Sequence, residues 1–111
     1  MAALCGVAVC LAGGCGPHLT FSCLGHLSSE IVCDEVWSEH DADYEDYLYC
    51  VKGLSGVSAP TPCADHGMGG CAYEGVSLTL TQVRVVRWYV SAASKDAVRA
   101  RCSPPDHYLE P

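Results

Sequence analysis

The chain contains no asparagine, and no lysine or arginine before Lys52. Without asparagine there is no N-x-Ser/Thr acceptor, which excludes N-linked glycosylation. Only 6 basic side chains stand against 13 carboxylates, for a formal net charge of −7. Because a phosphate backbone is bound through clustered positive charge, we predict that the protein does not bind nucleic acid.

The sequence also lacks the short motifs that carry common catalytic chemistry. It has no G-x-S-x-G, H-E-x-x-H or phosphate-binding glycine loop. A nucleophile needs a base within hydrogen-bond reach. The only close neighbours of suitable type are Cys63 and His66, and the glycine-rich stretch around them would position them poorly. We therefore predict that the protein is not an enzyme and has no resident organic cofactor.

What the chain does have is enough apolar residues for one packed core. Its 111 residues are 50% hydrophobic and 17% charged, which is unlike a chain that is disordered throughout. We expect a single small cysteine-rich domain over residues 16–111. Residues 1–15 precede it as a signal peptide or a hydrophobic N-terminal segment.

The N-terminal segment carries an apolar run, Ala2–Ala12, followed by two glycines. This resembles the h-region and cleavage zone of a signal peptide, although the basic n-region is missing. The glycines and Pro17 interrupt the run well short of the ~20 residues that a spanning helix needs. Membrane anchoring is therefore not favoured.

Nine cysteines point to disulfide bonds and to an oxidising compartment. Cleavage after Cys15 would leave six, for which fifteen pairings exist and none is selected by the sequence. An extracellular location is favoured over a cytoplasmic one. The disulfide candidates are Cys23, Cys33, Cys50, Cys63, Cys71 and Cys102.

The residue pattern predicts a small α+β fold. Side chains at intervals of four and three indicate a helix near 29–51, which Ser28 or Ser29 could cap. A glycine-rich loop follows over 53–75. Alternating apolar residues predict a short bulged strand or hairpin near 76–90. A C-terminal helix is expected near 94–102, capped by Ser91 or Ser94.

Eight of the 13 carboxylates lie between Glu30 and Asp46, a segment without Lys or Arg. Such a segment can be a solvated surface, or it can attract a basic protein surface. Two tyrosines among the acids add candidate sites of sulfation or phosphorylation, which would deepen the negative charge. The candidate contact or modification residues are Asp41, Asp43, Tyr44, Glu45, Asp46 and Tyr47.

One cluster has spacing that resembles a metal site. Cys63, His66 and Cys71 could supply three zinc ligands, and a fourth would have to come from elsewhere, such as Cys50 or His40. The competing interpretation is a glycine-rich loop whose cysteines are disulfide-bonded or free.

Three functional hypotheses follow. The first is a small secreted, non-enzymatic binding protein, held by disulfides, whose acidic tyrosine-bearing segment contacts a basic partner. The second is an intracellular Cys/His interaction module with zinc. The third is a poorly folded product of a recently arisen or alternative reading frame. The sequence leaves the oligomeric state open.

Overall fold

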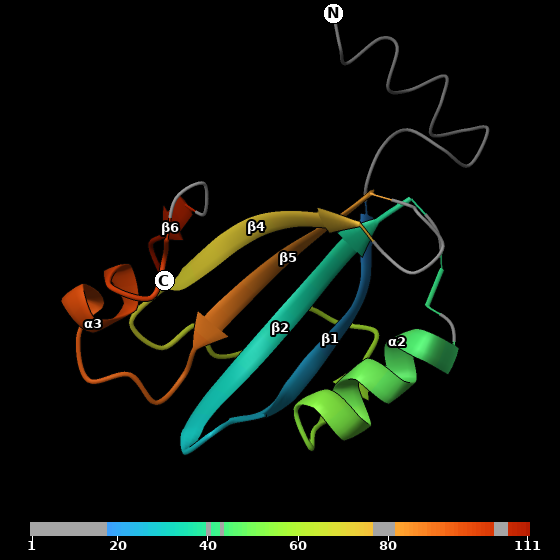
Figure 1. The fold of residues 1–111 in the computed structure, drawn as a ribbon, viewed down its shortest axis with the longest axis horizontal. Helices are drawn as coiled ribbons and strands as arrows, with labels where there is room; N and C mark the ends of the chain where they lie inside the picture. The colour runs from blue at the N-terminus through green and yellow to red at the C-terminus, as the bar shows by residue number, and fades with distance from the viewer. Residues whose placement is uncertain (1–17, 40, 43, 77–81, 104–106) are drawn as a thin grey trace, which may run out of the picture.

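The protein is a six-stranded antiparallel sheet with short helical segments at its ends (Figure 1). The computed structural model describes residues 18–39, 41–42, 44–76, 82–103 and 107–111. The strand order across the sheet is β3-β1-β2-β5-β4-β6. The strands are β1 (His18–Leu27), β2 (Glu30–Ser38), β3 (Val57–Ala59), β4 (Gly70–Val76), β5 (Gln82–Tyr89) and β6 (His107–Leu109).

The predicted α+β fold is wrong, and the main error is the helix expected near 29–51. Glu30–Ser38 is the long strand β2, paired with β1 on one side and β5 on the other. Ser28 and Ser29 do not cap a helix, because they form the two-residue turn between Leu27 and Glu30. Ser28 takes a positive φ of 57° there, as the first central residue of a tight hairpin turn often must.

Helical structure begins later and is brief. It comprises α2 (Tyr44–Leu48) and a π-helical turn, η1 (Tyr49–Gly53). The C-terminal helix expected near 94–102 is reduced to α3 (Lys95–Arg99). The Ser94 hydroxyl caps it by accepting a hydrogen bond of 3.1 Å from the Ala97 N–H.

The glycine-rich segment 53–75 is not a single loop. It contains the edge strand β3 and most of β4, which lies between β5 and β6. The strand pattern seen near 76–90 corresponds to β5, which pairs with β4 from Gly70 opposite Trp88 to Val76 opposite Gln82. Residues 77–81, within that expected hairpin, lie outside the described part of the chain.

The sheet has two covered faces. We call the first the helix face, which α2, η1 and α3 border; its buried side chains include Phe21, Cys23, Val32, Val36, Val85, Tyr89 and Val98. We call the second the loop face, over which the 60–69 segment runs. The buried apolar side chains of this face are Cys33, Cys63, Ala72, Val86 and Trp88. A strand between two covered faces buries both sets of side chains, and β2 does so over most of its length.

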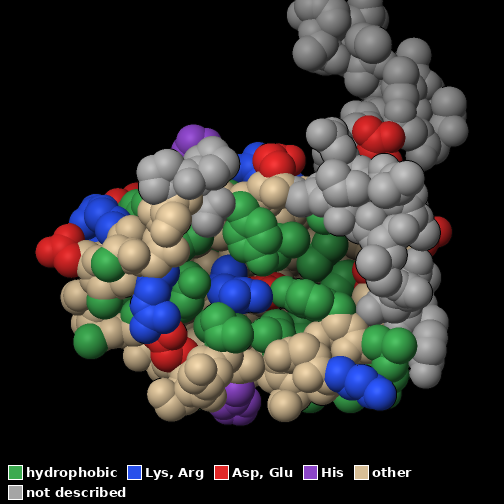
Figure 2. Space-filling model, in the orientation of Figure 1, with side chains coloured by type: hydrophobic (Ala, Val, Ile, Leu, Met, Phe, Trp, Pro, Cys, Tyr) green, Lys and Arg blue, Asp and Glu red, His purple; other side chains and the backbone are tan. Residues whose placement is uncertain are grey.

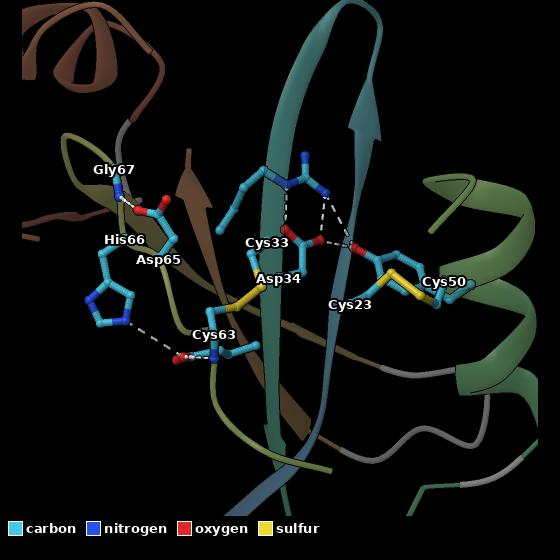
Figure 3. Close-up of a disulfide and its surroundings, with 11 residues drawn as sticks. Cys23, Cys33, Asp34, Cys50, Cys63, Asp65, His66 and Gly67 are labelled. Atoms are coloured by element: carbon cyan, nitrogen blue, oxygen red, sulfur yellow. Dashed lines mark hydrogen bonds and ion pairs between the residues drawn. A yellow bond between two sulfur atoms is a disulfide. The ribbon is translucent and has the colours of Figure 1, made fainter. Parts of the chain in front are cut away.

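Three disulfides hold the covering segments to the sheet, which confirms the expectation of a disulfide-bonded chain. Cys23–Cys50 ties η1 to the helix face, and Cys33–Cys63 ties the 60–69 segment to the loop face. Figure 3 shows these two bonds on opposite sides of β2. Cys71–Cys102 fastens the segment after α3 to β4. Within the described part of the chain, the bonded cysteines are the six disulfide candidates.

Candidate binding site

An open pocket of about 410 Å³ lies on the loop face. Its floor comes from alternate residues of β2 and β5, because residues two apart on a strand point to the same face. β6, at the sheet edge, completes the wall. The lining residues are Glu35, Trp37, Arg84, Val86, Trp88 and Leu109.

Glu35 provides a carboxylate that is almost fully buried, with an exposed fraction of 5%. Its Oε2 accepts a hydrogen bond of 2.9 Å from the Cys63 backbone N–H. The Nε2 atom of His66 lies 4.0 Å from the same oxygen, and both interactions are drawn in Figure 3. The Cys33–Cys63 disulfide fixes the backbone that makes this hydrogen bond.

Both tryptophans of the chain line this pocket. Trp88 is 7% exposed, and the His66 ring stacks on it with the ring centroids 3.8 Å apart and the planes 8° from parallel. Among the described residues, the indole N–H of Trp88 has no hydrogen-bond partner. Trp37 is only partly buried. The site therefore combines the partly exposed ring of Trp37 with the buried ring of Trp88.

Arg84 supplies a positive charge to the same pocket. It pairs with Trp37 across the β2–β5 ladder, and this pair lies two residues along the strands from the pair of Glu35 and Val86. Its side chain is about half exposed, and its Nε lies 3.9 Å from the Glu74 carboxylate. A ligand at this pocket would meet one buried negative and one exposed positive group.

Exposed apolar side chains extend the loop face toward the β3 edge. The pairing places Val57, Leu24, Cys33 and Trp88 in one row across four neighbouring strands. Val57 is 75% exposed and Leu24 is 51% exposed, and Ile31 is also exposed on this face. Contiguous exposed apolar surface is characteristic of protein contact sites.

The helix face holds a second polar cluster, which is already satisfied from within. Asp34 is fully buried, and Arg87 donates to its two carboxylate oxygens from Nε and Nη2, each at 2.8 Å. The Tyr49 hydroxyl donates to the same carboxylate. Figure 2 shows hydrophobic side chains gathered around Lys and Arg side chains in the middle of this face.

The pKa shifts in this cluster agree with a structural role. Burial raises the pKa of Tyr49, and the adjacent Asp34 carboxylate raises it further. The hydrogen bond to Asp34 raises the pKa of Arg87 and outweighs the effect of its burial. Tyr49 thus stays protonated and Arg87 stays charged at neutral pH, so the cluster anchors η1 to β2 and β5.

The predicted zinc ligands are not brought together. Cys63 and Cys71 are bonded to Cys33 and Cys102, so neither has a thiolate to offer a metal ion. His66 lies against Trp88. Within the described ranges, no group of three His, Cys, Asp or Glu residues could hold a metal ion.

The acidic segment is divided by the fold. Asp34 and Glu35 are buried on opposite faces of β2. Glu30 is paired with Arg101 at 2.6 Å. Asp41 is fully exposed, with its carboxylate 3.9 Å from His18.

The candidate contact residues that follow lie mostly in and around α2. Tyr44 begins α2, Glu45 and Asp46 follow it, and Tyr47 is 51% exposed. Asp43 lies outside the described residues. The structure does not bring these residues together with the loop-face pocket as one site.

Sequence reasoning missed Glu35, Trp37, Arg84 and Trp88 as site residues. The signal that could have found them is alternation: Glu35 and Trp37 are two apart, as are Arg84, Val86 and Trp88. It indicates a shared face only when both segments are recognised as strands.

Comparison of the chain with protein-family models, with curated proteins and with solved structures gives no match. Among the described residues, no helix is long and apolar enough to cross a membrane.

Proposed function

We propose that the chain is a small extracellular, non-enzymatic binding protein whose loop face contacts a basic protein partner. The observation that carries this proposal is the pocket around the buried Glu35 carboxylate, on the same face of the sheet as the exposed apolar side chains of Leu24 and Val57. A flat apolar area beside a charged, aromatic pocket suits a macromolecular partner, since interfaces place aromatic anchors within such surfaces.

Three further features support a basic partner outside the cytosol. The net charge of −7 would steer a positively charged protein toward the chain. Exposed Glu39 lies two residues beyond Trp37, so negative charge continues past the pocket. The three disulfides are typical of proteins that fold in an oxidising compartment.

The test is a titration of the oxidised protein with a synthetic peptide in which Arg and Lys alternate with Ser and Leu. The matched control peptide carries Glu at every basic position. Both tryptophans line the pocket, so intrinsic fluorescence reports on binding there. We expect the basic peptide to change the emission and to bind more weakly at high salt, because salt screens exposed charges.

Variants locate the contact. Val57→Arg places a positive charge on the loop face, and Val51→Arg makes the same change at an exposed position of η1. The first should weaken binding of the basic peptide and the second should not. Equal binding of both peptides, or equal effects of the two variants, would contradict the proposed function.

A further inference from the structure

Glu35 and its neighbour Asp34 are both buried carboxylates of β2, but their partners on the neighbouring strand differ. Across the ladder, Asp34 faces Arg87, which binds it through two nitrogen atoms. Glu35 faces Val86, which offers no charge. A buried carboxylate is costly unless a cation or several hydrogen bonds satisfy it.

The partners that Glu35 has within the described residues leave room for a cation. It accepts one backbone N–H, from Cys63, and the nearest candidate cation is His66, with Nε2 at 4.0 Å. The pocket of about 410 Å³ opens beside this carboxylate and is large enough for a long side chain. We infer that the pocket takes an arginine side chain of the basic partner, with its guanidinium on Glu35.

Arginine fits this pocket better than lysine for two reasons. A guanidinium is planar and donates to a carboxylate through two parallel N–H groups, as Arg87 does on the other face of the strand. It also stacks on aromatic rings, and Trp37 presents a partly exposed indole beside Glu35. A lysine ammonium lacks the planar fork and is more strongly hydrated.

The same pocket recognises an oxygen next to the arginine. Arg84 stands half exposed at the wall of the pocket. A main-chain carbonyl or an acidic side chain adjacent to the partner's arginine would accept a hydrogen bond from the Arg84 guanidinium. The inferred ligand is thus an arginine within an extended segment of the partner protein, and this inference rests on the proposed function.

The experiment compares three capped tripeptides, acetyl-Ser-X-Ser-amide, where X is arginine, lysine or citrulline. Citrulline keeps the size and planarity of arginine but has no charge. Tryptophan emission of the intact oxidised protein gives the dissociation constants. We expect the arginine peptide to bind about tenfold more tightly than the lysine peptide, and the citrulline peptide to bind more weakly still.

Two variants and a control locate the guanidinium. Glu35→Gln keeps an acceptor for the Cys63 N–H and removes the charge, so arginine binding should weaken about tenfold. Asp96→Asn removes a charge at a highly exposed position of α3 and should bind as the wild type does. If Glu35→Gln does not fold, Trp37→Leu, with Trp88 as the reporter, should also lose the preference for arginine over lysine.

The results separate this inference from the proposed function. Equal binding of the arginine and lysine tripeptides, or unchanged arginine binding in Glu35→Gln or Trp37→Leu, would overturn the arginine site. The proposed function would survive that outcome if the longer basic peptide still bound and Val57→Arg still weakened it. Failure of the longer peptide to bind would remove the proposed function itself.

Discussion

Removing Arg87 should destabilise the protein more than removing any exposed basic residue. In Arg87→Leu, the fully buried Asp34 would lose both guanidinium hydrogen bonds, and among the described side chains the Tyr49 hydroxyl would remain as its partner. Leaving one member of a buried ion pair without its partner typically costs about 3–5 kcal/mol. That is a large part of the roughly 5–15 kcal/mol that stabilises a typical domain.

The reasoning can be tested with a double-mutant cycle. Asp34→Val alone leaves Arg87 without its carboxylate partner, whereas Asp34→Val combined with Arg87→Leu removes both charges and fills the space with apolar atoms. We expect the double variant to lie within about 1–2 kcal/mol of the wild type, since apolar replacements of buried pairs are well tolerated. The matched control is Arg84→Leu, which removes an exposed pair with Glu74 and should cost less than about 1 kcal/mol.

Equilibrium unfolding in urea, with the disulfides kept intact, measures the free energy of unfolding of the four proteins in the cycle and of the control. A loss below about 1 kcal/mol in Arg87→Leu would refute the structural role assigned to the cluster. So would a double variant whose loss equals the sum of the two single losses, because the two side chains would then not interact.

Three other predictions concern the stability of the folded protein. Burial and Asp34 raise the pKa of Tyr49 in the folded state, so the unfolded state loses this proton first. The free energy of unfolding should therefore fall as pH rises above about 10, and it should fall less steeply in Tyr49→Phe. Urea unfolding across pH 9–11 measures both. Replacing Cys33 and Cys63 together by Ala opens a loop with a sequence separation of 30 and should cost about 3–4 kcal/mol by thermal unfolding, with a shift in tryptophan emission. Gly67→Ala should lower the melting temperature, because a Cβ would lie 2.4 Å from the Tyr89 carbonyl oxygen at a positive φ; an unchanged melting temperature would contradict this.

Short-range sequence patterns can predict an element whose structure depends on a few neighbouring residues. Ser94 was one of two candidate caps, and the strand expected near 76–90 overlaps β5, because capping chemistry and alternation are properties of a few neighbouring residues. The disulfide-bonded character of the chain followed from the cysteine content. The pairing itself did not, since it depends on which strands lie next to each other.

β2 could not be recognised because its burial hides the alternation. It is covered on both faces, and it buries Asp34 on one and Glu35 on the other, so polar residues do not mark a solvent side. The two-residue turn before it contains neither glycine nor asparagine, so the usual signal of a hairpin is missing, and Ser28 adopts the positive φ instead. The recurrence of Cys33, Trp37 and Tyr44 then resembled one face of a helix.

The pocket depends on the same missing strand. Glu35 and Trp37 meet Arg84, Val86 and Trp88 only through the pairing of β2 with β5, some fifty residues later in the chain. The two strands are far apart in the chain, so a pattern within either segment does not reveal that they pair. The acidic segment was visible in the sequence, but its division between two faces was not.

The most direct test of the account is disulfide mapping of the unreduced protein from its native source. Proteolysis with free thiols alkylated, followed by mass spectrometry, identifies each linked peptide pair. The account predicts Cys23 with Cys50, Cys33 with Cys63, and Cys71 with Cys102. Free thiols at these six positions, or any other pairing, would contradict the fold and the pocket that the Cys33–Cys63 bond supports.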